Sequence, residues 1–195
     1  MGLSINYSGK FKLKASLKEM IREVEDIVKV YQWKYHIYET EFPETGFDKV
    51  YNDKIYGISF SPPECEPVFL CFLSNGKISC PPYLKIFGNS TRKDYQLYLY
   101  HLSTKTQYAG ILVHKLVIHI LKYISKKYLS SFKMMDEGHY WETGDEKVLE
   151  KNFKLYNHLL DVVSDTLQNL PQKTGETFEE YFERALKVIN KKRPK

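Results

Sequence analysis

The residues best suited to chemistry lie together in the stretch MMDEGHYWETGDE, residues 134–146. Five carboxylates, one histidine and one tryptophan share these thirteen positions. A carboxylate beside an imidazole can exchange protons with a substrate or can hold a metal ion. The candidate catalytic residues are Asp136, Glu137, His139 and Glu142, together with His114 if the fold brings it close, and the candidate binding residues are Tyr140 and Trp141.

The same stretch also has the pattern of a turn followed by the start of a helix. Thr143 and Glu146 are spaced as a capping box, which puts the last two acids of the stretch in a first helical turn, where carboxylates complement the helix dipole. Gly138 permits a tight turn before that helix, so His139 and Glu142 would not share a helical face suited to a metal. Two interpretations stay open: a reactive cluster, or a loop of solvated acids whose tryptophan closes a corner of the core.

The other residues of catalytic type show weaker patterns. His114 and His119 lie five positions apart on a predicted helix, so their side chains point about 140° apart and cannot readily share a ligand. Cys65, Cys71 and Cys80 form no CxxC pair, and their spacing does not suit zinc. The GxSxG, P-loop and GxGxxG motifs are absent. The sequence therefore predicts no metal site and no cofactor.

The charge of the chain is concentrated at one end. The net charge is +5, but four of the basic residues lie in the last six positions, NKKRPK, which leaves the rest of the chain close to neutral. Basic ends are usually solvated, so this pattern makes a nucleic-acid partner unlikely. No apolar run has the length of a signal peptide or a membrane span. We therefore expect a cytoplasmic protein with no membrane contact and with an unknown protein or small-molecule partner.

The elements that must position these residues follow from hydrophobic periodicity and capping patterns. Strands are predicted at 3–8, 34–42, 55–61, 67–73 and 95–101, and helices at 17–32, 105–128, 144–168 and 178–191. Capping boxes at Ser16/Glu19, Thr104/Gln107, Thr143/Glu146 and Thr177/Glu180 mark the four helix starts. Asn75-Gly76 between apolar runs predicts a hairpin, and the segments 43–54 and 81–94 are predicted loops.

These elements predict an α+β fold, in which a mainly antiparallel sheet packs against helices. Residues 1–192 are predicted to form a single domain, mostly sheet over 1–103 and mostly helical over 104–192, followed by a basic tail at 193–195. One helix, near 17–32, belongs to the first half, and three belong to the second.

Three blocks, TKTQYAG at 104–110, DEGHYWETGDE at 136–146 and GETFEEYFERAL at 175–186, carry a likeness to other proteins. The chain resembles a family of uncharacterised bacterial proteins that have similar blocks in the same order. The resemblance implies a bacterial, cytoplasmic, single-domain protein, and it implies no activity, cofactor or site residue.

The sequence favours a binding or regulatory module, because nucleophile and cofactor motifs are missing while tyrosine is abundant. The alternative is a hydrolase or metal-dependent enzyme with its site in the acidic and histidine loop at 136–142. That alternative requires the candidate side chains to converge on one cleft. A nucleic-acid-binding protein would instead need a basic face on the body of the chain, away from the tail.

Overall fold

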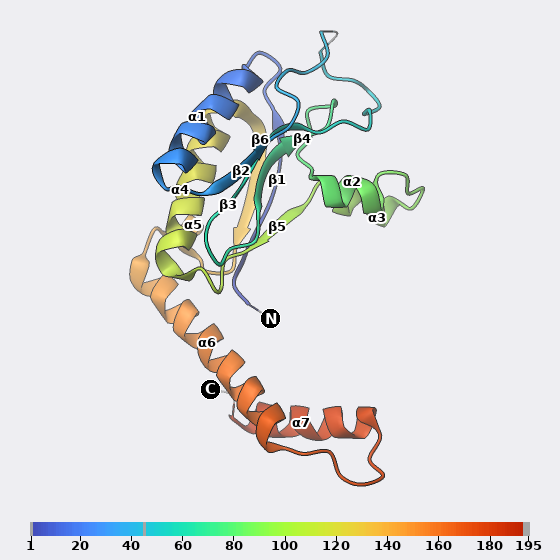
Figure 1. Cartoon of the computed structure of the whole chain (residues 1–195), viewed down its shortest axis with the longest axis vertical. Helices are drawn as coiled ribbons and strands as arrows, with labels where there is room; N and C mark the ends of the chain where they lie inside the picture. Colours follow the sequence, from blue (N-terminus) through green and yellow to red (C-terminus); the bar gives the residue numbers. More distant parts are fainter. Residues whose placement is uncertain (1, 45, 193–195) are drawn as a thin grey trace.

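The structure is a computed structural model that describes residues 2–44 and 46–192, so the predicted basic tail at 193–195 lies outside the described residues. Within these residues the chain has an α+β fold of seven helices and two three-stranded antiparallel sheets (Figure 1). No helix in the described ranges is both long enough and apolar enough to cross a membrane.

The first sheet has β1 (Ser4–Phe11) in its centre, between β5 (Leu102–Lys105) and β6 (Leu129–Asp136). The alternation of a strand places Ile5, Tyr7 and Phe11 of β1 in the core. The serine, asparagine and lysine residues between them face the opposite side of the sheet, where Ser8 is paired with Lys133 of β6. This face of the sheet is therefore open, and it carries polar side chains of β1 together with the exposed Met135 of β6, which is paired with Asn6.

The second sheet consists of β2 (Lys34–Ile37), β3 (Tyr56–Ser61) and β4 (Val68–Phe72). The predicted Asn-Gly turn follows β4, and Gly76 takes a φ of 75°, which favours glycine. The turn then joins the two sheets: Phe11 N donates to Gly76 O, and Ile78 N donates to Gly9 O. This link brings Lys77 beside Lys10.

Two helices, α1 (Leu17–Val30) and α4 (Gly110–Tyr128), cover the apolar side of the sheets (Figure 1). The Ser16 hydroxyl caps α1 by accepting from Glu19 N, which confirms the predicted start of this helix. The core between helices and sheets is built from the buried side chains of Ile5, Tyr7, Met20, Val24, Val28, Ile58, Phe60, Leu70, Phe72, Val117, Leu121 and Ile124.

Two predictions between residues 81 and 101 were wrong. The predicted loop contains α2 (Pro81–Phe87), and the predicted strand at 95–101 contains α3 (Lys93–Tyr98). The alternating pattern of YQLYLYH also matches a helix, because Tyr95 and Leu99 lie one turn apart and are the more buried members. Leu97, which a strand would have buried, is 64% exposed.

The predicted cap at Thr104 was also wrong. Thr104 is a fully buried residue of β5 whose hydroxyl donates to Pro67 O, and Gln107 accepts from Leu3 N. The Thr104 hydroxyl therefore ties β5 to the segment before β4, and Gln107 holds the residue before β1, so neither side chain caps a helix. Helix α4 begins later, at Gly110.

The remaining helices are the short α5 (Tyr140–Thr143), then α6 (Glu146–Asn169) and α7 (Phe178–Lys192). Leu149 and Phe153 anchor the first half of α6 against Leu3. The second half of α6 leaves the body and meets α7 (Figure 1). We call the second half of α6 together with α7 the arm.

Candidate functional site

Asp136 is the centre of the predicted acidic cluster, and its carboxylate points into the protein. Its side chain is 0% exposed. Oδ1 accepts from Gly138 N at 2.7 Å, and Oδ2 accepts from Tyr140 N at 2.7 Å and from Trp141 N at 3.0 Å. The carboxylate therefore holds the turn between β6 and α5 together.

His114, on α4, faces Asp136 across the fold. Its Nε2 lies 3.0 Å from Asp136 Oδ1, although the N–H direction is not aligned for a good hydrogen bond. Its Nδ1 lies 2.7 Å from the hydroxyl of Thr106. Burial by itself would raise the pKa of Asp136, but His114 and the N–H groups of Trp141 and Gly138 outweigh it, so the pKa lies below its usual value.

The Thr106–His114–Asp136 series has the order hydroxyl, imidazole, carboxylate that activates a nucleophile in many enzymes. Here all three residues are 0% exposed. A substrate therefore has no access to the hydroxyl. The series acts as a buried polar network that ties β5, α4 and the end of β6 together.

The side chains of the other candidate residues do not converge with Asp136 on a cleft. Glu137 is half-buried and accepts from Ser4 N at 2.7 Å, which fixes the start of β1. Glu142 is exposed, with Oε1 3.4 Å from Asp136 N, and His139 is exposed in a left-handed conformation with a φ of 58°. Among the described residues, no three His, Cys, Asp or Glu side chains are grouped to hold a metal ion.

The two candidate binding residues pack against the body. Trp141 is half-buried, with its ring edge-on to Phe132 at 5.7 Å and with Lys122 over its face. The Tyr140 hydroxyl lies 3.3 Å from Nε2 of His119. Both aromatic rings are engaged in packing between α4, α5 and β6.

The helix start after this turn also differs from the prediction. Asp145, and not Thr143, is the N-cap of α6, because its Oδ1 accepts from Lys147 N. Gly138 matters for its small size: a Cβ there would lie 2.6 Å from Leu149 Cδ1 and 2.9 Å from His114 Nε2. The residue that takes the left-handed turn conformation is His139.

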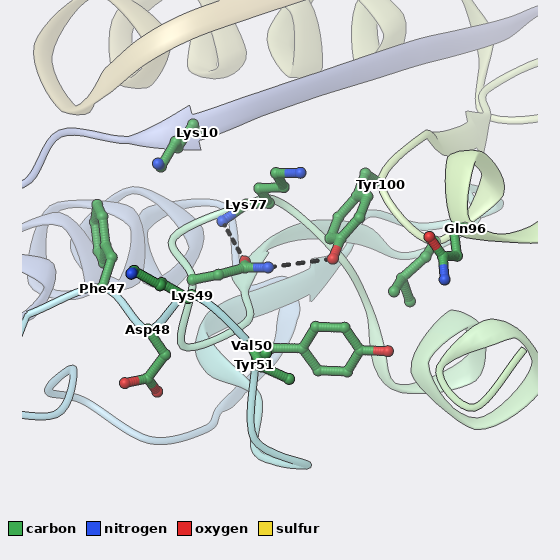
Figure 2. Close-up of a pocket in the computed structure, with 11 residues that line it drawn as sticks. Lys10, Phe47, Asp48, Lys49, Val50, Tyr51, Lys77, Gln96 and Tyr100 are labelled. Atoms are coloured by element: carbon green, nitrogen blue, oxygen red, sulfur yellow. Dashed lines mark hydrogen bonds between the residues drawn. The ribbon is translucent and has the colours of Figure 1, made fainter. Parts of the chain in front are cut away.

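A cavity that opens to solvent lies away from this network, beside the end of β1. Figure 2 shows a cavity of about 470 Å³ between β1, the 75–77 turn, the loop that precedes β3 and the end of α3. Its polar lining comes from Lys10, Asp48, Lys49, Tyr51, Asn75, Lys77, Gln96 and Tyr100.

Three lysines, Lys10, Lys49 and Lys77, line this cavity from three separate segments (Figure 2). Lys10 is half-buried on β1, whereas Lys49 and Lys77 are exposed on the loop and the turn. No ion pair between these ammonium groups and a carboxylate occurs in the part of the chain that the structure describes. With three lysines and the single carboxylate of Asp48 in its lining, the cavity carries an excess of positive charge.

Hydrogen bonds fix the wall of the cavity. Asn75 accepts from Lys77 N at 3.0 Å through its side-chain oxygen and donates from Nδ2 to the Tyr100 hydroxyl at 3.1 Å (Figure 2). The ammonium of Lys77 lies 4.5 Å from the centre of the Tyr100 ring. The Tyr51 hydroxyl donates to Gly88 O, which holds the loop against α2.

The cavity continues along the open face of the first sheet. A neighbouring hollow of about 320 Å³ shares Lys10, Lys77 and Tyr100 with it, and a third of about 270 Å³ extends past Lys133 to the far end of the face. We call the three together the basic groove. Its lining includes four lysines, at 10, 49, 77 and 133, and one carboxylate, Asp48.

No local pattern in the sequence indicates the basic groove. Its lysines are spread over more than 120 positions, in a body that is close to neutral overall. Strand pairing brings them together: Ser8 is paired with Lys133, and the turn bridges to Lys10. The one available signal was the alternation of polar residues in SINYSGK, which places a serine, an asparagine and a lysine on the same side of β1.

Comparisons with protein-family models, with curated protein sequences and with solved structures found no match to this chain. The geometry of the buried network and of the basic groove is therefore what distinguishes the candidate functions.

Proposed function

We propose that this protein is a binding module that holds a ligand with more than one phosphate group in the basic groove. One observation carries the proposal: four lysines share the groove, and none of their ammonium groups is ion-paired within the described residues. Clustered unpaired lysines raise the potential of a concave surface and attract anions.

The shape and lining of the groove support an extended ligand over a compact one. The three hollows follow β1 from Lys10 to Asn6, a distance of about 13 Å between Cα atoms at the usual rise of a strand. Ser8, Ser131 and His101 add polar contacts between Lys10 and Lys133. A ligand with several phosphates can contact Lys10 and Lys133 at once.

Aromatic side chains lie beside the lysines. Tyr51, Tyr100 and Phe47 line the widest part of the groove, where Lys10 lies 5.5 Å from the centre of the Phe47 ring. Basic grooves with aromatic faces are typical of proteins that bind single-stranded nucleic acid or nucleotides. Both kinds of ligand carry phosphate groups. The experiment must therefore distinguish a nucleic-acid polymer from a small phosphate-bearing molecule.

The test uses fluorescein-labelled oligo(dT) of twelve nucleotides and, separately, inorganic tripolyphosphate. We expect oligo(dT) to bind at low salt, and we expect tripolyphosphate to raise the thermal midpoint of unfolding. The Lys10→Gln/Lys77→Gln/Lys133→Gln variant should lose both effects. Its slope of log binding constant against log salt should fall by about 2 to 3, because three phosphate contacts are removed.

The matched control is Lys147→Gln/Lys151→Gln/Lys154→Gln, which removes the same charge from exposed positions on α6. It should bind like the parent. The proposal fails if the parent binds neither probe, or if the two triple variants weaken binding equally. Binding of tripolyphosphate without oligo(dT) would assign the groove to a small phosphate-bearing ligand, and binding of both would assign it to a polymer.

A further inference from the structure

The aromatic side chains of the basic groove are confined to one end. Phe47, Tyr51 and Tyr100 line the cavity of about 470 Å³, which we call the wide end, and of these three only Tyr100 also borders the second hollow. The third hollow is bordered by Tyr7, which is 2% exposed and so offers almost no ring surface. Among the described residues that line the groove, aromatic faces are therefore accessible at the wide end alone.

Tyr51 has the ring whose faces are least engaged by other side chains. Its hydroxyl donates to Gly88 O, which holds the side chain in place (Figure 2). In the part of the chain that the structure describes, Lys77 lies over the ring of Tyr100, whereas no cation and no second ring lies over Tyr51. Tyr51 packs against the buried cluster that contains Leu99, but it is only half-buried. Part of a fixed ring is therefore accessible to a ligand in the wide end.

Polar groups with unused hydrogen-bonding capacity lie beside these rings. The Tyr100 hydroxyl accepts from Asn75 Nδ2 and keeps its own hydrogen to donate. Gln96 donates from Nε2 to Ser90 O at 3.3 Å, which leaves its side-chain oxygen able to accept. A ring surface with a donor and an acceptor nearby suits a nucleobase, which has a flat apolar face and a polar edge. A sugar phosphate lacks the flat face, and a lipid tail lacks the polar edge.

The lysines continue from the wide end along the sheet. Lys77 is bridged directly to Lys10, and Lys10 is paired with Ser131, two residues before Lys133 on β6. Directly opposite residues have Cβ atoms about 5 Å apart, and diagonal neighbours lie about 7 to 8 Å apart. Lys77, Lys10 and Lys133 therefore form a row of cations that begins beside the Tyr100 ring and leads away from it. Successive phosphate groups of one ligand can lie along this row.

We propose that the ligand of the basic groove is a nucleotide, with a single base against Tyr51 in the wide end and with its phosphate groups along Lys77, Lys10 and Lys133. This inference rests on the proposed function, because it requires the groove to bind phosphate groups. It adds the base, the place of the base and the direction in which the phosphates run. A volume of about 470 Å³ lies within the range of small-ligand sites, roughly 300 to 1,000 Å³.

The distribution of rings also limits the number of bases to one. Proteins that hold a long strand through its bases stack successive bases on successive aromatic side chains. In this groove the rings of Phe47, Tyr51 and Tyr100 line one cavity, and serine, asparagine and lysine side chains line the continuation. One base is therefore bound, whether the nucleotide is free or belongs to a strand.

The first test compares ligands that share a triphosphate chain and differ in the base. Deoxyadenosine triphosphate, thymidine triphosphate, methyl triphosphate and inorganic tripolyphosphate are titrated into the full chain in a calorimeter at one salt concentration. Methyl triphosphate matches the ionisable oxygens of the nucleotides but has no base. We expect the tighter nucleotide to bind about tenfold more tightly than methyl triphosphate, because a base stacked on an aromatic ring contributes at least this much.

The outcomes separate this inference from the proposed function. If tripolyphosphate binds and neither nucleotide binds more tightly than methyl triphosphate, the base site is wrong while the phosphate-binding groove stands. If none of the four ligands binds, the proposed function fails and the base site fails with it.

The second test removes the ring of Tyr51. Tyr51→Leu and Tyr51→Phe both lose the hydrogen bond to Gly88 O, but only the phenylalanine keeps a ring. We expect Tyr51→Leu to bind the tighter nucleotide about tenfold more weakly than Tyr51→Phe does. Both variants should bind tripolyphosphate within about twofold of the parent, which shows that the lysines and the fold are intact. Equal nucleotide binding by the two variants would overturn the placement of the base at Tyr51.

The third test determines the direction of the phosphates. Lys133 lies at the end of the row, so Lys133→Gln should weaken the nucleoside triphosphate about fivefold and leave the corresponding monophosphate unchanged. Lys77→Gln, next to the rings, should weaken both. If Lys133→Gln weakens the triphosphate and the monophosphate equally, or weakens neither, the proposed direction is wrong.

Competition identifies the source of the nucleotide. Displacement of fluorescein-labelled oligo(dT) by the tighter nucleoside triphosphate would assign the site to one base of a strand. Binding of the nucleotide to a chain that does not bind oligo(dT) would assign it to a free nucleotide. Oligo(dT) that binds and is not displaced at saturating nucleotide would overturn the shared site.

Discussion

Asp136 shows how a residue of catalytic type is used structurally in this protein. Its two carboxylate oxygens accept from three backbone N–H groups, and the imidazole of His114 lies against it. Both side chains are fully buried. A buried carboxylate is tolerated only when such partners compensate the loss of hydration. The residues that sequence patterns indicate as reactive are here those that close the turn between β6 and α5.

Replacing Asp136 with Asn should destabilise the fold in a pH-dependent way. The folded-state pKa of Asp136 is below its usual 3.8, so the carboxylate contributes stability above pH 4 and loses it as the pH falls through the lower folded-state pKa. We expect Asp136→Asn to lower the free energy of unfolding by about 3 kcal/mol at pH 7. In urea unfolding, the difference in the free energy of unfolding between parent and variant should become smaller as the pH falls from 7 to 3. A difference that does not change with pH would contradict this account.

Alanine substitutions at Gly138 and Gly144 should destabilise the fold for two different reasons, a steric collision at Gly138 and backbone strain at Gly144. Gly138→Ala should cost about 2 kcal/mol, because its Cβ would collide with Leu149 and His114 in a packed region. Gly144 has a φ of 65° with open space around it, so Gly144→Ala should cost about 1 kcal/mol from strain alone. Thermal unfolding of both variants checks the order, and equal midpoints would show that the Gly138 site can relax.

At the scale of elements, local capping patterns predicted some helix starts correctly and others wrongly. Ser16 and Thr177 cap helices as predicted, whereas Thr104 lies within β5. A threonine followed three residues later by a glutamine satisfies the same local pattern in both settings. The pairing of β1 with β5, which no local pattern reveals, decides that Thr104 belongs to a strand.

The start of α7 provides a direct test of capping. Thr177→Ala removes the acceptor for Glu180 N and should cost about 1 kcal/mol of helix stability. Hydrogen exchange at the first amides of α7 should become faster while the amides of β1 keep their protection. Thr174→Ala, in the exposed linker, is the control and should leave both unchanged. Unaltered exchange in Thr177→Ala would mean that the ion pair of Arg184 with Glu176 holds the helix start without the cap.

At the scale of the whole molecule, the basic groove and the arm are separate surfaces. The groove lies on the open face of the first sheet, whereas the arm begins in the second half of α6, where that helix leaves the body (Figure 1). No residue that lines the groove belongs to α6 or α7.

We expect the groove substitutions to affect one surface only. The Lys10→Gln/Lys77→Gln/Lys133→Gln variant should keep the mass of the parent in sedimentation, because no residue that lines the groove belongs to α6 or α7 and additivity holds for distant sites. A change of mass in this variant would show that the groove and the arm are coupled.

The sequence by itself determined the α+β class, the strands β1 to β4, the Asn-Gly turn and the approximate positions of the four long helices. Strands β5 and β6, which flank β1, were not predicted. The predicted features depend on residues within one or two turns of each other, where side-chain period, caps and turn conformations act directly. The pairing of His114 with the acidic loop could be named only as an option, because 22 positions separate His114 from Asp136.

The tertiary structure alone decided which polar residues are accessible. Asp136 and His114 are candidate catalytic residues by type, but their burial makes them a structural pair. Strand pairing brings Lys10, Lys77 and Lys133 from distant positions in the sequence into one groove. The net charge of a sequence segment counts residues that the fold may place far from each other. The electrostatic potential at a surface depends instead on the distances between the charged side chains. Those distances, and the access of solvent to each group, come from the packing of β1 between its two partners.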